Sequence, residues 1–378
     1  MKSLLKLSAL VLLAMACNTP SNTTPKGPKL PPMPEGPAQW VHYEGLKGPG
    51  AGKHIVFVSG DEEYRSEEAL PQLASILSQQ HGFDCTVLFA QDPADPGIVR
   101  PKYLNNIPGL AALQSADLMF MFTRFRALPD EQMQEIDNYL KSGKPVIGMR
   151  TATHAFMSKD STYKWLHYTF NYKGEMTGWE DGFGRTVLGE TWRYHHGHHK
   201  YQSTRGIIAG GAHDHPITKG LDKVDIWGPT DVYGIRLPVQ QSVKPILLGQ
   251  VINAVDTFKA EDPMFGLRPT DKEVAEINPS RPDAGNPNDP MMPIAWTKDY
   301  QIPGGKPGQA FCSTIGSSTD LLSEGVRKMY VNAAFYLTGL EVPANASAAL
   351  VGDYQPSAYS FMSDEYWEEL QLKVASFQ

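Results

Sequence analysis

Short apolar runs that alternate with helical patterns constrain the fold of this chain most strongly. The runs show no polar alternation, so each predicts a strand that is buried on both faces; they are HIVFVSG (54–60), DCTVLFA (84–90), ADLMFMFT (116–123) and PVIGM (145–149). Residues 61–83 and 129–144 carry apolar side chains at helical spacing, and Gly143 is a suitable helix stop. Buried strands separated by helices predict a doubly wound α/β fold with a mainly parallel sheet.

The carboxyl ends of these strands are rich in polar residues. Folds of this class bind their ligands at that edge of the sheet, so we expect one polar rim there. Its members follow the first, third and fourth strands, and include Glu62, Tyr64, Arg65, Arg124, Arg126, Arg150 and His154. Arg150 is the residue that we select first, because a charge directly after a buried apolar strand is costly unless it lies at the rim.

The rest of the chain indicates one domain with insertions, over residues 53–340. Aromatic and histidine-rich segments occupy residues 160–240, and KPILLGQVI (244–252) predicts a strand. Residues 253–292 are dense in Pro, Asp and Asn and predict a long surface insertion, after which strand and helix patterns return. The tail, 341–378, contains the amphipathic segment SDEYWEELQLKV and is expected to pack back on the domain.

The N-terminus is typical of an exported bacterial lipoprotein. Residues 1–17 combine Lys2 and Lys6 with an apolar run and end in Ala-Met-Ala-Cys, which resembles a lipobox with Cys17 as the lipidated residue. An ordinary cleaved signal is the alternative. Residues 18–52 are poor in apolar residues and predict a disordered linker. We therefore expect a periplasmic or cell-surface protein whose membrane contact is confined to its lipid anchor.

The charge balance argues against a nucleic-acid partner. The chain has 34 basic and 41 acidic residues and no long basic run. A small-molecule ligand is the better expectation. Beyond the signal segment the cysteines are Cys85 and Cys312, which lie in apolar runs and are expected to be buried thiols, with a disulfide as the alternative.

An ordered set of motifs resembles the ThuA-like (trehalose-utilisation) family, and in particular its exported bacterial members. The set runs from GDEEYRSEEALP through GMRTATHAF, HHGHH, HPITKGL and TDVYGIRL to PIAW and GQAFCSTIG, within residues 53–340. The resemblance implies a flavodoxin-like sheet similar to that of class I glutamine amidotransferases. It also implies a role in carbohydrate metabolism, on disaccharides or their keto derivatives.

Two departures limit what the resemblance transfers. Amidotransferases carry a nucleophilic cysteine on the turn that reads Gly148-Met149-Arg150-Thr151 here, so glutamine hydrolysis is excluded. ThuA-like proteins often have histidine at the position of Arg150 and a Gly-His pair where this chain has Gly316-Ser317. Roles of those two histidines are therefore not assigned to this chain.

The segment RYHHGHHKY (193–201) is the main candidate for chemistry. In an extended chain alternate side chains share a face, so His196 and His198 are expected to point together and away from His195 and His199. Without a metal, His196, His198 or His154 would move a proton. Asp231 or Glu62 would orient the base, and Arg150 and Arg124 would stabilise negative charge. The alternative is a divalent metal bound by His196 and His198; no other cofactor is indicated. A solvated loop is the third interpretation.

These residues predict a carbohydrate-directed active site. The residues expected to bind the substrate are Glu62, Tyr64, Arg65, Arg124, Trp179 and Tyr233. Hydrolase, lyase and isomerase chemistry all remain open. The competing functions are a non-catalytic carbohydrate-binding lipoprotein and a metal-dependent hydrolase.

Overall fold

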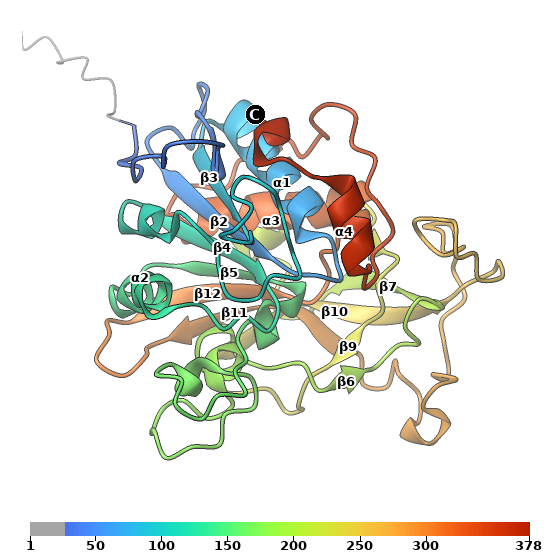
Figure 1. Cartoon of the computed structure of the whole chain (residues 1–378). Coiled ribbons are helices and arrows are strands. Elements are labelled where there is room, and N and C mark those ends of the chain that lie inside the picture. The colour runs from blue at the N-terminus through green and yellow to red at the C-terminus, as the bar shows by residue number, and fades with distance from the viewer. Residues whose placement is uncertain (1–26) are drawn as a thin grey trace, which may run out of the picture.

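A single ten-stranded sheet organises the computed structural model, which describes residues 27–378 (Figure 1). In spatial order its strands are β1 (Trp40–Tyr43), β3 (Asp84–Phe89), β2 (His54–Gly60), β4 (Leu118–Thr123), β5 (Val146–Met149), β12 (Gly308–Ser313), β11 (Met292–Tyr300), β10 (Val243–Asn253), β7 (Gln202–Ile208) and β8 (Trp227–Gly228). The five strands from β3 to β12 run parallel, whereas β1 at one edge and β11 to β8 at the other are antiparallel additions. The predicted α/β class with a mainly parallel centre is confirmed, and the antiparallel wing is an addition to it.

The crossover connections fix where a ligand can bind. The chain passes from β2 to β3 in one direction, through α1 (Ser66–His81), and from β4 to β5 in the other, through α2 (Asp130–Lys141). Because such crossovers are right-handed, the two helices cover opposite faces of the sheet. The strand order therefore reverses between β2 and β4, and this reversal opens a crevice at their carboxyl ends.

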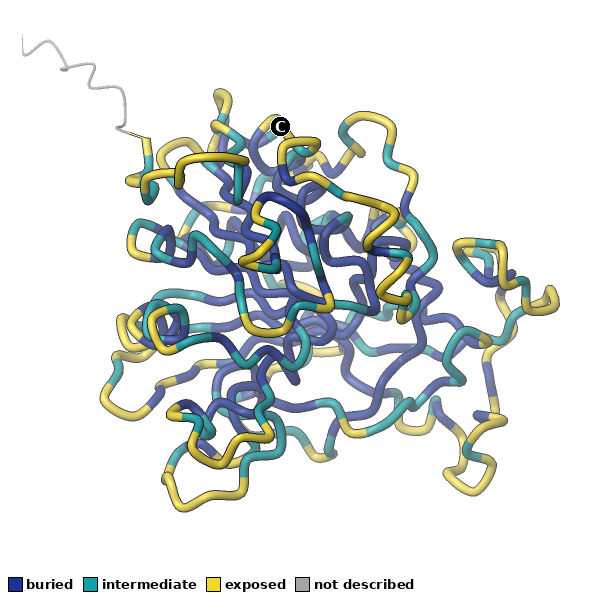
Figure 2. Tube along the Cα trace, viewed as in Figure 1, coloured by how far each residue is buried: buried dark blue, intermediate teal, exposed yellow. Residues whose placement is uncertain are grey.

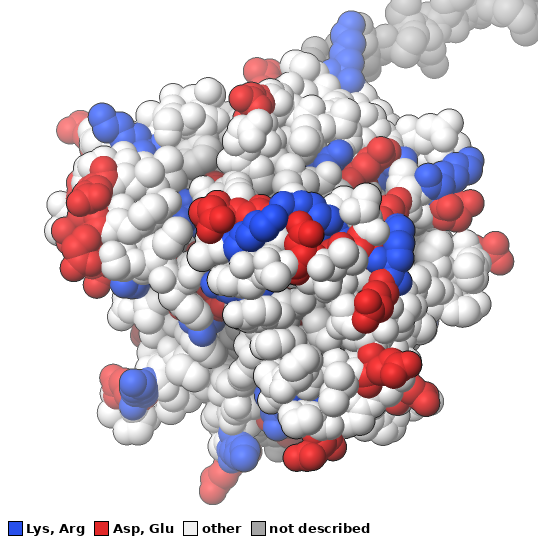
Figure 3. All heavy atoms as spheres, turned by 90° about the vertical axis from the view of Figure 1, so that its right-hand side faces the viewer, with Lys and Arg blue, Asp and Glu red and all other residues white. Residues whose placement is uncertain are grey.

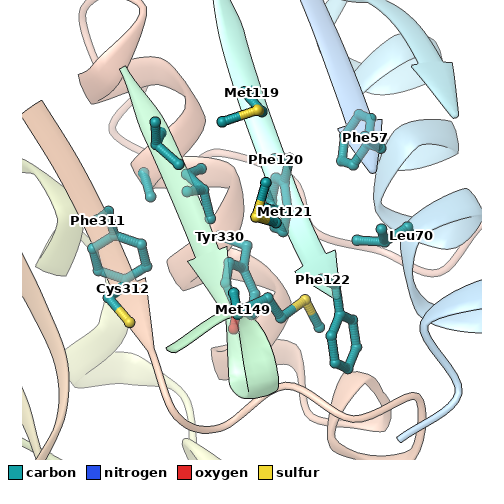
Figure 4. Close-up of a cluster of buried hydrophobic side chains, with 14 of the residues drawn as sticks. Phe57, Leu70, Met119, Phe120, Met121, Phe122, Met149, Phe311, Cys312 and Tyr330 are labelled. Carbon is teal, nitrogen blue, oxygen red and sulfur yellow. The ribbon is translucent and has the colours of Figure 1, made fainter. Parts of the chain in front are cut away.

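The core lies on both sides of the parallel strands. All seven residues of β2 and all six of β4 are buried, as the apolar runs predict (Figure 2). The rings of Phe57 and Phe120 stack at 5.0 Å, and Phe120 reaches Tyr330 of α3 (Glu324–Leu337) at 5.4 Å (Figure 4). Cys85 and Cys312 are both buried free thiols. This dense packing holds the strand ends in fixed positions.

The N-terminal prediction is wrong in one part. Residues 40–43, within the linker expected to be disordered, form β1, and Trp40 and Val41 are buried against β3. Burial of Trp40 and Val41 is enough to add β1 to the edge of the sheet. The mean composition of residues 18–52 does not reveal so short an apolar pair. The signal segment and Cys17 lie outside the described residues.

The C-terminal tail lies along the domain and returns toward the carboxyl edge of the sheet. It carries α4 (Asp364–Leu370), in which Trp367 is buried, and Phe377 stacks on Phe89 at 5.1 Å. The segment between β10 and β11 extends from the body as a largely exposed excursion (Figures 1 and 2). On that side of the molecule acidic and basic side chains are interspersed (Figure 3). Within residues 27–378, each helix is too short or too polar to cross a bilayer.

Candidate functional site

A pocket of about 190 Å³ lies at the point where the strand order reverses. It is lined by side chains from the ends of β2, β4 and β5, from residues 192–195 and 233, and from the tail, namely Glu63, Tyr64, Arg124, Phe125, Arg150, Thr151, His154, Trp192, His195, Tyr233 and Phe361. The strand-end rim therefore forms one concave site. Of the predicted site residues, Tyr64, Arg124, Arg150, His154 and Tyr233 line it.

Arg150, which lines the pocket, forms a buried ion pair with Asp231 behind it. Arg150 and Asp231 have 1% and 0% of their side chains exposed, and Arg150 Nη2 lies 3.0 Å from Asp231 Oδ1. The same guanidinium donates to the carbonyl oxygens of Asp231 at 3.0 Å and Thr314 at 2.5 Å, and its Nη2 lies 3.3 Å from the Tyr64 hydroxyl. Both terminal nitrogens of Arg150 thus bind protein groups, which secures the position of Asp231.

Arg150 also has an unusual backbone. Its φ of 47° lies in the left-handed region, directly after β5 and at the start of a 3₁₀ turn, Arg150–His154. Non-glycine residues adopt this region at a cost of about 1 kcal/mol or more, so surrounding contacts must hold it. The hydroxyl of Tyr233 supplies one such contact by donating to the Arg150 carbonyl at 2.8 Å.

Two histidines converge on the Asp231 carboxylate. His195 donates from Nδ1 to Oδ2 at 2.9 Å, and His199 donates from Nδ1 to Oδ1 at 3.0 Å. The pairing of β6 (Tyr194–His195) with β9 (Tyr233–Gly234) brings His195 beside Asp231. Burial raises the pKa of Asp231, but the two histidine hydrogen bonds and the charge of Arg150 outweigh it and hold that pKa well below its usual range. The carboxylate is therefore ionised and saturated with donors.

The expected orientation of His196 and His198 is wrong. The Nε2 atom of His196 lies 2.7 Å from the carbonyl oxygen of Pro287, and the ring of His198 stacks on Tyr201 at 4.4 Å. Neither side chain lines the pocket. Alternation holds only in an extended chain, whereas here the amide of Gln202 donates to the His198 carbonyl and closes a turn. That turn brings His199 back to the side of His195.

Glu63 supplies a carboxyl group with a strongly shifted pKa. Burial and the neighbouring charge of Asp61 raise its pKa to about 7, against the opposing effect of Arg124 and Arg150. Its Oε1 lies 3.7 Å from His199 Nε2. At neutral pH this carboxyl is therefore distributed between its acid and base forms, as a proton donor requires.

His195 has the complementary property. Burial lowers its pKa, but the hydrogen bond to Asp231 and the charge of that carboxylate outweigh this effect, so the pKa is raised above 6.5. Its side chain is 40% exposed and lines the pocket, and Nε2 has no hydrogen-bond partner within the described residues. The ring is thus oriented by Asp231 and leaves one nitrogen for a ligand.

His154 lies in an aromatic wall of the same pocket. Phe125, Phe170 and Trp192 surround its ring, with centroids between 5.1 and 5.9 Å away. Burial, together with the positive charges of Arg124, Arg150 and His195, lowers the pKa of His154 well below 6.5. The ring is therefore neutral and offers a hydrogen-bonding group among apolar faces.

Three residues predicted to bind substrate lie away from the pocket lining. Glu62 pairs with Arg124 and, at 2.6 Å, with Arg126, and thereby fixes the pocket arginine. Arg65 is buried and pairs with Glu67 and Glu68, both at 2.8 Å. Trp179 is buried against Tyr168 at 4.2 Å and belongs to the core. These three side chains make ion pairs and packing contacts within the protein. Residue type alone does not distinguish such a role from substrate binding.

Several members of the site are not among the residues that the sequence predicts. His195 and His199 were assigned to the wrong face, and Glu63, Phe125 and Phe361 were not selected as binding residues. Glu63 and Phe125 do carry a signal, because they lie within three residues of the ends of β2 and β4, the strands that meet at the reversal. Phe361 carries no such signal, since it reaches the pocket from the distant tail.

The cluster of His195, His199 and Asp231 also has the composition of a divalent-metal site. Their candidate ligand atoms lie within 4.8 Å of one another. Two histidines and a carboxylate are a known catalytic ligand set that leaves positions open. However, both carboxylate oxygens already accept hydrogen bonds, and the Arg150 guanidinium would add a positive charge next to the ion. The residues therefore fit a divalent metal in type, while the charge of Arg150 beside Asp231 disfavours a cation there.

No protein-family model matches the chain, and no curated protein matches it. Among solved structures it is similar to a thua-like protein from Bacteroides uniformis, with a TM-score of 0.44 and 14% identity over 77% of this chain and 93% of that one. A thua-like protein from Parabacteroides merdae gives a TM-score of 0.41 and 13% identity, over 82% and 98%.

Proposed function

We propose that this protein is a ThuA-like enzyme of carbohydrate metabolism that transfers a proton on a disaccharide, a glycoside or a keto sugar. One observation carries the proposal: His195 is oriented by Asp231 and faces a pocket that also holds Glu63. An oriented histidine and a carboxyl of pKa about 7 form an acid–base pair suited to neutral pH. The aromatic side chains of the wall offer flat apolar faces of the kind on which sugar rings stack.

The roles within the site follow from the contacts. His195 accepts a proton at Nε2, and Asp231 stabilises the imidazolium that forms. Glu63 donates a proton to the substrate after His195 has removed one. The proton held by His195 is then released to solvent, and Glu63 takes up a proton from solvent to regain its acid form. Arg150 acts as a positioning residue, because its terminal nitrogens bind Asp231, Thr314 and Tyr64. Arg124 remains the cation available to a developing oxyanion.

Solvent-isotope incorporation tests this proposal directly. The full chain is incubated in D₂O with trehalose, methyl glucosides and 3-keto-glucosides, and deuterium at carbon positions is followed by NMR together with product formation. We expect His195→Ala to lower kcat/KM by about 10²- to 10⁴-fold. His213→Ala is the matched control, because His213 is exposed and lies outside the pocket.

The same assay separates the competing functions. Binding of these sugars without turnover would support the carbohydrate-binding alternative, and equal rates in His195→Ala and the parent would exclude His195 as the base. A metal-dependent hydrolase is the second candidate, supported by the convergence of His195, His199 and Asp231. In that case those three residues would hold the ion, which would polarise the substrate.

Export is part of the proposal. The signal pattern and Cys17 support a lipid-anchored protein of the periplasm or cell surface. Cys17→Ala, followed by fractionation of the producing cells, tests it: we expect the protein to move from the membrane to the soluble fraction. An unchanged distribution would contradict the anchor.

A further inference from the structure

The C-terminal segment 357–370, which we name the strap, passes along the pocket and is fixed on both sides of it. Before the pocket, Tyr359 is fully buried and stacks on Tyr64 at 5.1 Å. Beyond it, Trp367 is buried beneath the guanidinium of Arg65, which lies 4.9 Å from its ring centroid. The intervening residues are thus held in place without being buried themselves.

The strap lies directly beside the histidine segment. The rings of Tyr359 and His199 are 5.6 Å apart, and Lys200 Nζ lies 3.3 Å from the Ser360 hydroxyl. The next residue, Phe361, lines the pocket together with His195. The guanidinium of Arg124 lies 4.8 Å from the Phe361 ring centroid. The strap therefore contributes one aromatic side chain to the site.

Phe361 is 56% exposed, unlike the buried aromatic residues on either side of it in the strap. Its ring is the part of the pocket wall that a ligand would remove from water. The pocket itself, at about 190 Å³, is smaller than the roughly 300–1,000 Å³ typical of sites for drug-sized ligands. A ligand of one pyranose ring matches that size better than a complete disaccharide.

We propose that Phe361 is a substrate-contacting residue that covers the pocket and packs against a single sugar ring. The sugar part of this inference rests on the proposed function, whereas the cover rests on the position of the strap alone. The remainder of a glycoside would then lie outside the pocket, past Phe361. This makes the tail, which is distant in sequence from the acid–base residues, a determinant of ligand choice.

The cover is tested without any sugar. Diethyl pyrocarbonate is added at limiting concentration to the full chain, and carbethoxylation of His195 and His213 is followed by mass spectrometry. We expect Phe361→Ala to raise the rate at His195 several-fold and to leave that at His213 unchanged. Met176→Ala, which removes another exposed apolar side chain outside the pocket, is the control and should change neither rate. An unchanged His195 rate in Phe361→Ala would overturn the cover.

The sugar contact is tested with methyl α-glucoside as the protecting probe. We expect it to slow carbethoxylation of His195 in the parent protein, with a half-protecting concentration about ten-fold higher in Phe361→Ala and restored in Phe361→Trp. Equal protection of parent and Phe361→Ala would overturn the contact. Absence of protection in the parent protein would reject the sugar as ligand and its contact with Phe361. The carbethoxylation rate of His195 without sugar would still test whether Phe361 covers the pocket.

Discussion

Replacement of Glu63 by glutamine should stabilise the protein at alkaline pH and have little effect at acid pH. The pKa of Glu63 rises from 4.5 to about 7 on folding, mainly because of burial. At 1.36 kcal/mol for each tenfold change in proton affinity, this difference corresponds to about 3 kcal/mol. The unfolded chain loses this proton near pH 4.5, whereas the folded chain keeps it until about pH 7. The stabilising contribution is therefore complete below pH 4.5 and is lost as the pH rises through 7.

Glutamine mimics the protonated carboxyl at every pH. The free energy of unfolding of Glu63→Gln, minus that of the parent, should be near zero at pH 4 and approach about 3 kcal/mol at pH 8. Urea denaturation followed by circular dichroism at both pH values measures it. Glu369→Gln is the control, because Glu369 is exposed and should give no pH-dependent difference. A difference that is the same at pH 4 and pH 8, or a destabilised variant at pH 8, would refute the reasoning.

Three further predictions concern the buried cluster. Asp231→Asn should destabilise the fold by about 3–5 kcal/mol because it leaves the Arg150 charge buried and unpaired, and Arg150→Met in the same chain should recover much of that loss in thermal unfolding. The pH profile of kcat/KM should be bell-shaped, with one limb from the loss of the His195 proton, whose pKa is raised by Asp231, and a falling limb as Glu63 ionises near pH 7. A profile that lacks either limb would contradict the acid–base pair. Protein purified without chelators should hold no stoichiometric zinc or manganese by plasma mass spectrometry, and it should keep its activity in EDTA. One equivalent of metal in the parent protein that is lost in His199→Ala and kept in His213→Ala would favour the metal centre.

The parallel half of the fold could be predicted because its signal is local. Continuous apolar runs such as HIVFVSG have few alternatives to a doubly covered strand, and the structure places one at β2. The same local logic placed Arg150 and His154 at the strand ends. In the antiparallel wing the signal is uneven: KPILLGQVI predicts β10, whereas β8 has only two residues, which is too short for any periodicity to appear in the sequence.

The histidine segment shows where local reasoning fails. The prediction that alternate histidines share a face assumes an extended chain. The turn between His198 and Gln202 breaks that pattern and brings the rings of His195 and His199 together. The pairing is set by the position of Asp231, more than thirty residues later in the chain. Phe361 is a similar case, because its place depends on the docking of Tyr359 and Trp367. Contacts of this kind are properties of the packed chain.

The strand β1 decides where the chain can be shortened. A protein trimmed to begin at residue 53, where the sequence alone places the domain boundary, would lose the partner of β3. It would expose the unpaired amide and carbonyl groups of Asp84–Phe89, a strand that is apolar and almost wholly buried. Such an edge pairs readily with other chains and is a common origin of aggregation. Soluble material for the experiments above therefore requires Trp40–Tyr43, even though these four residues lie far from the pocket.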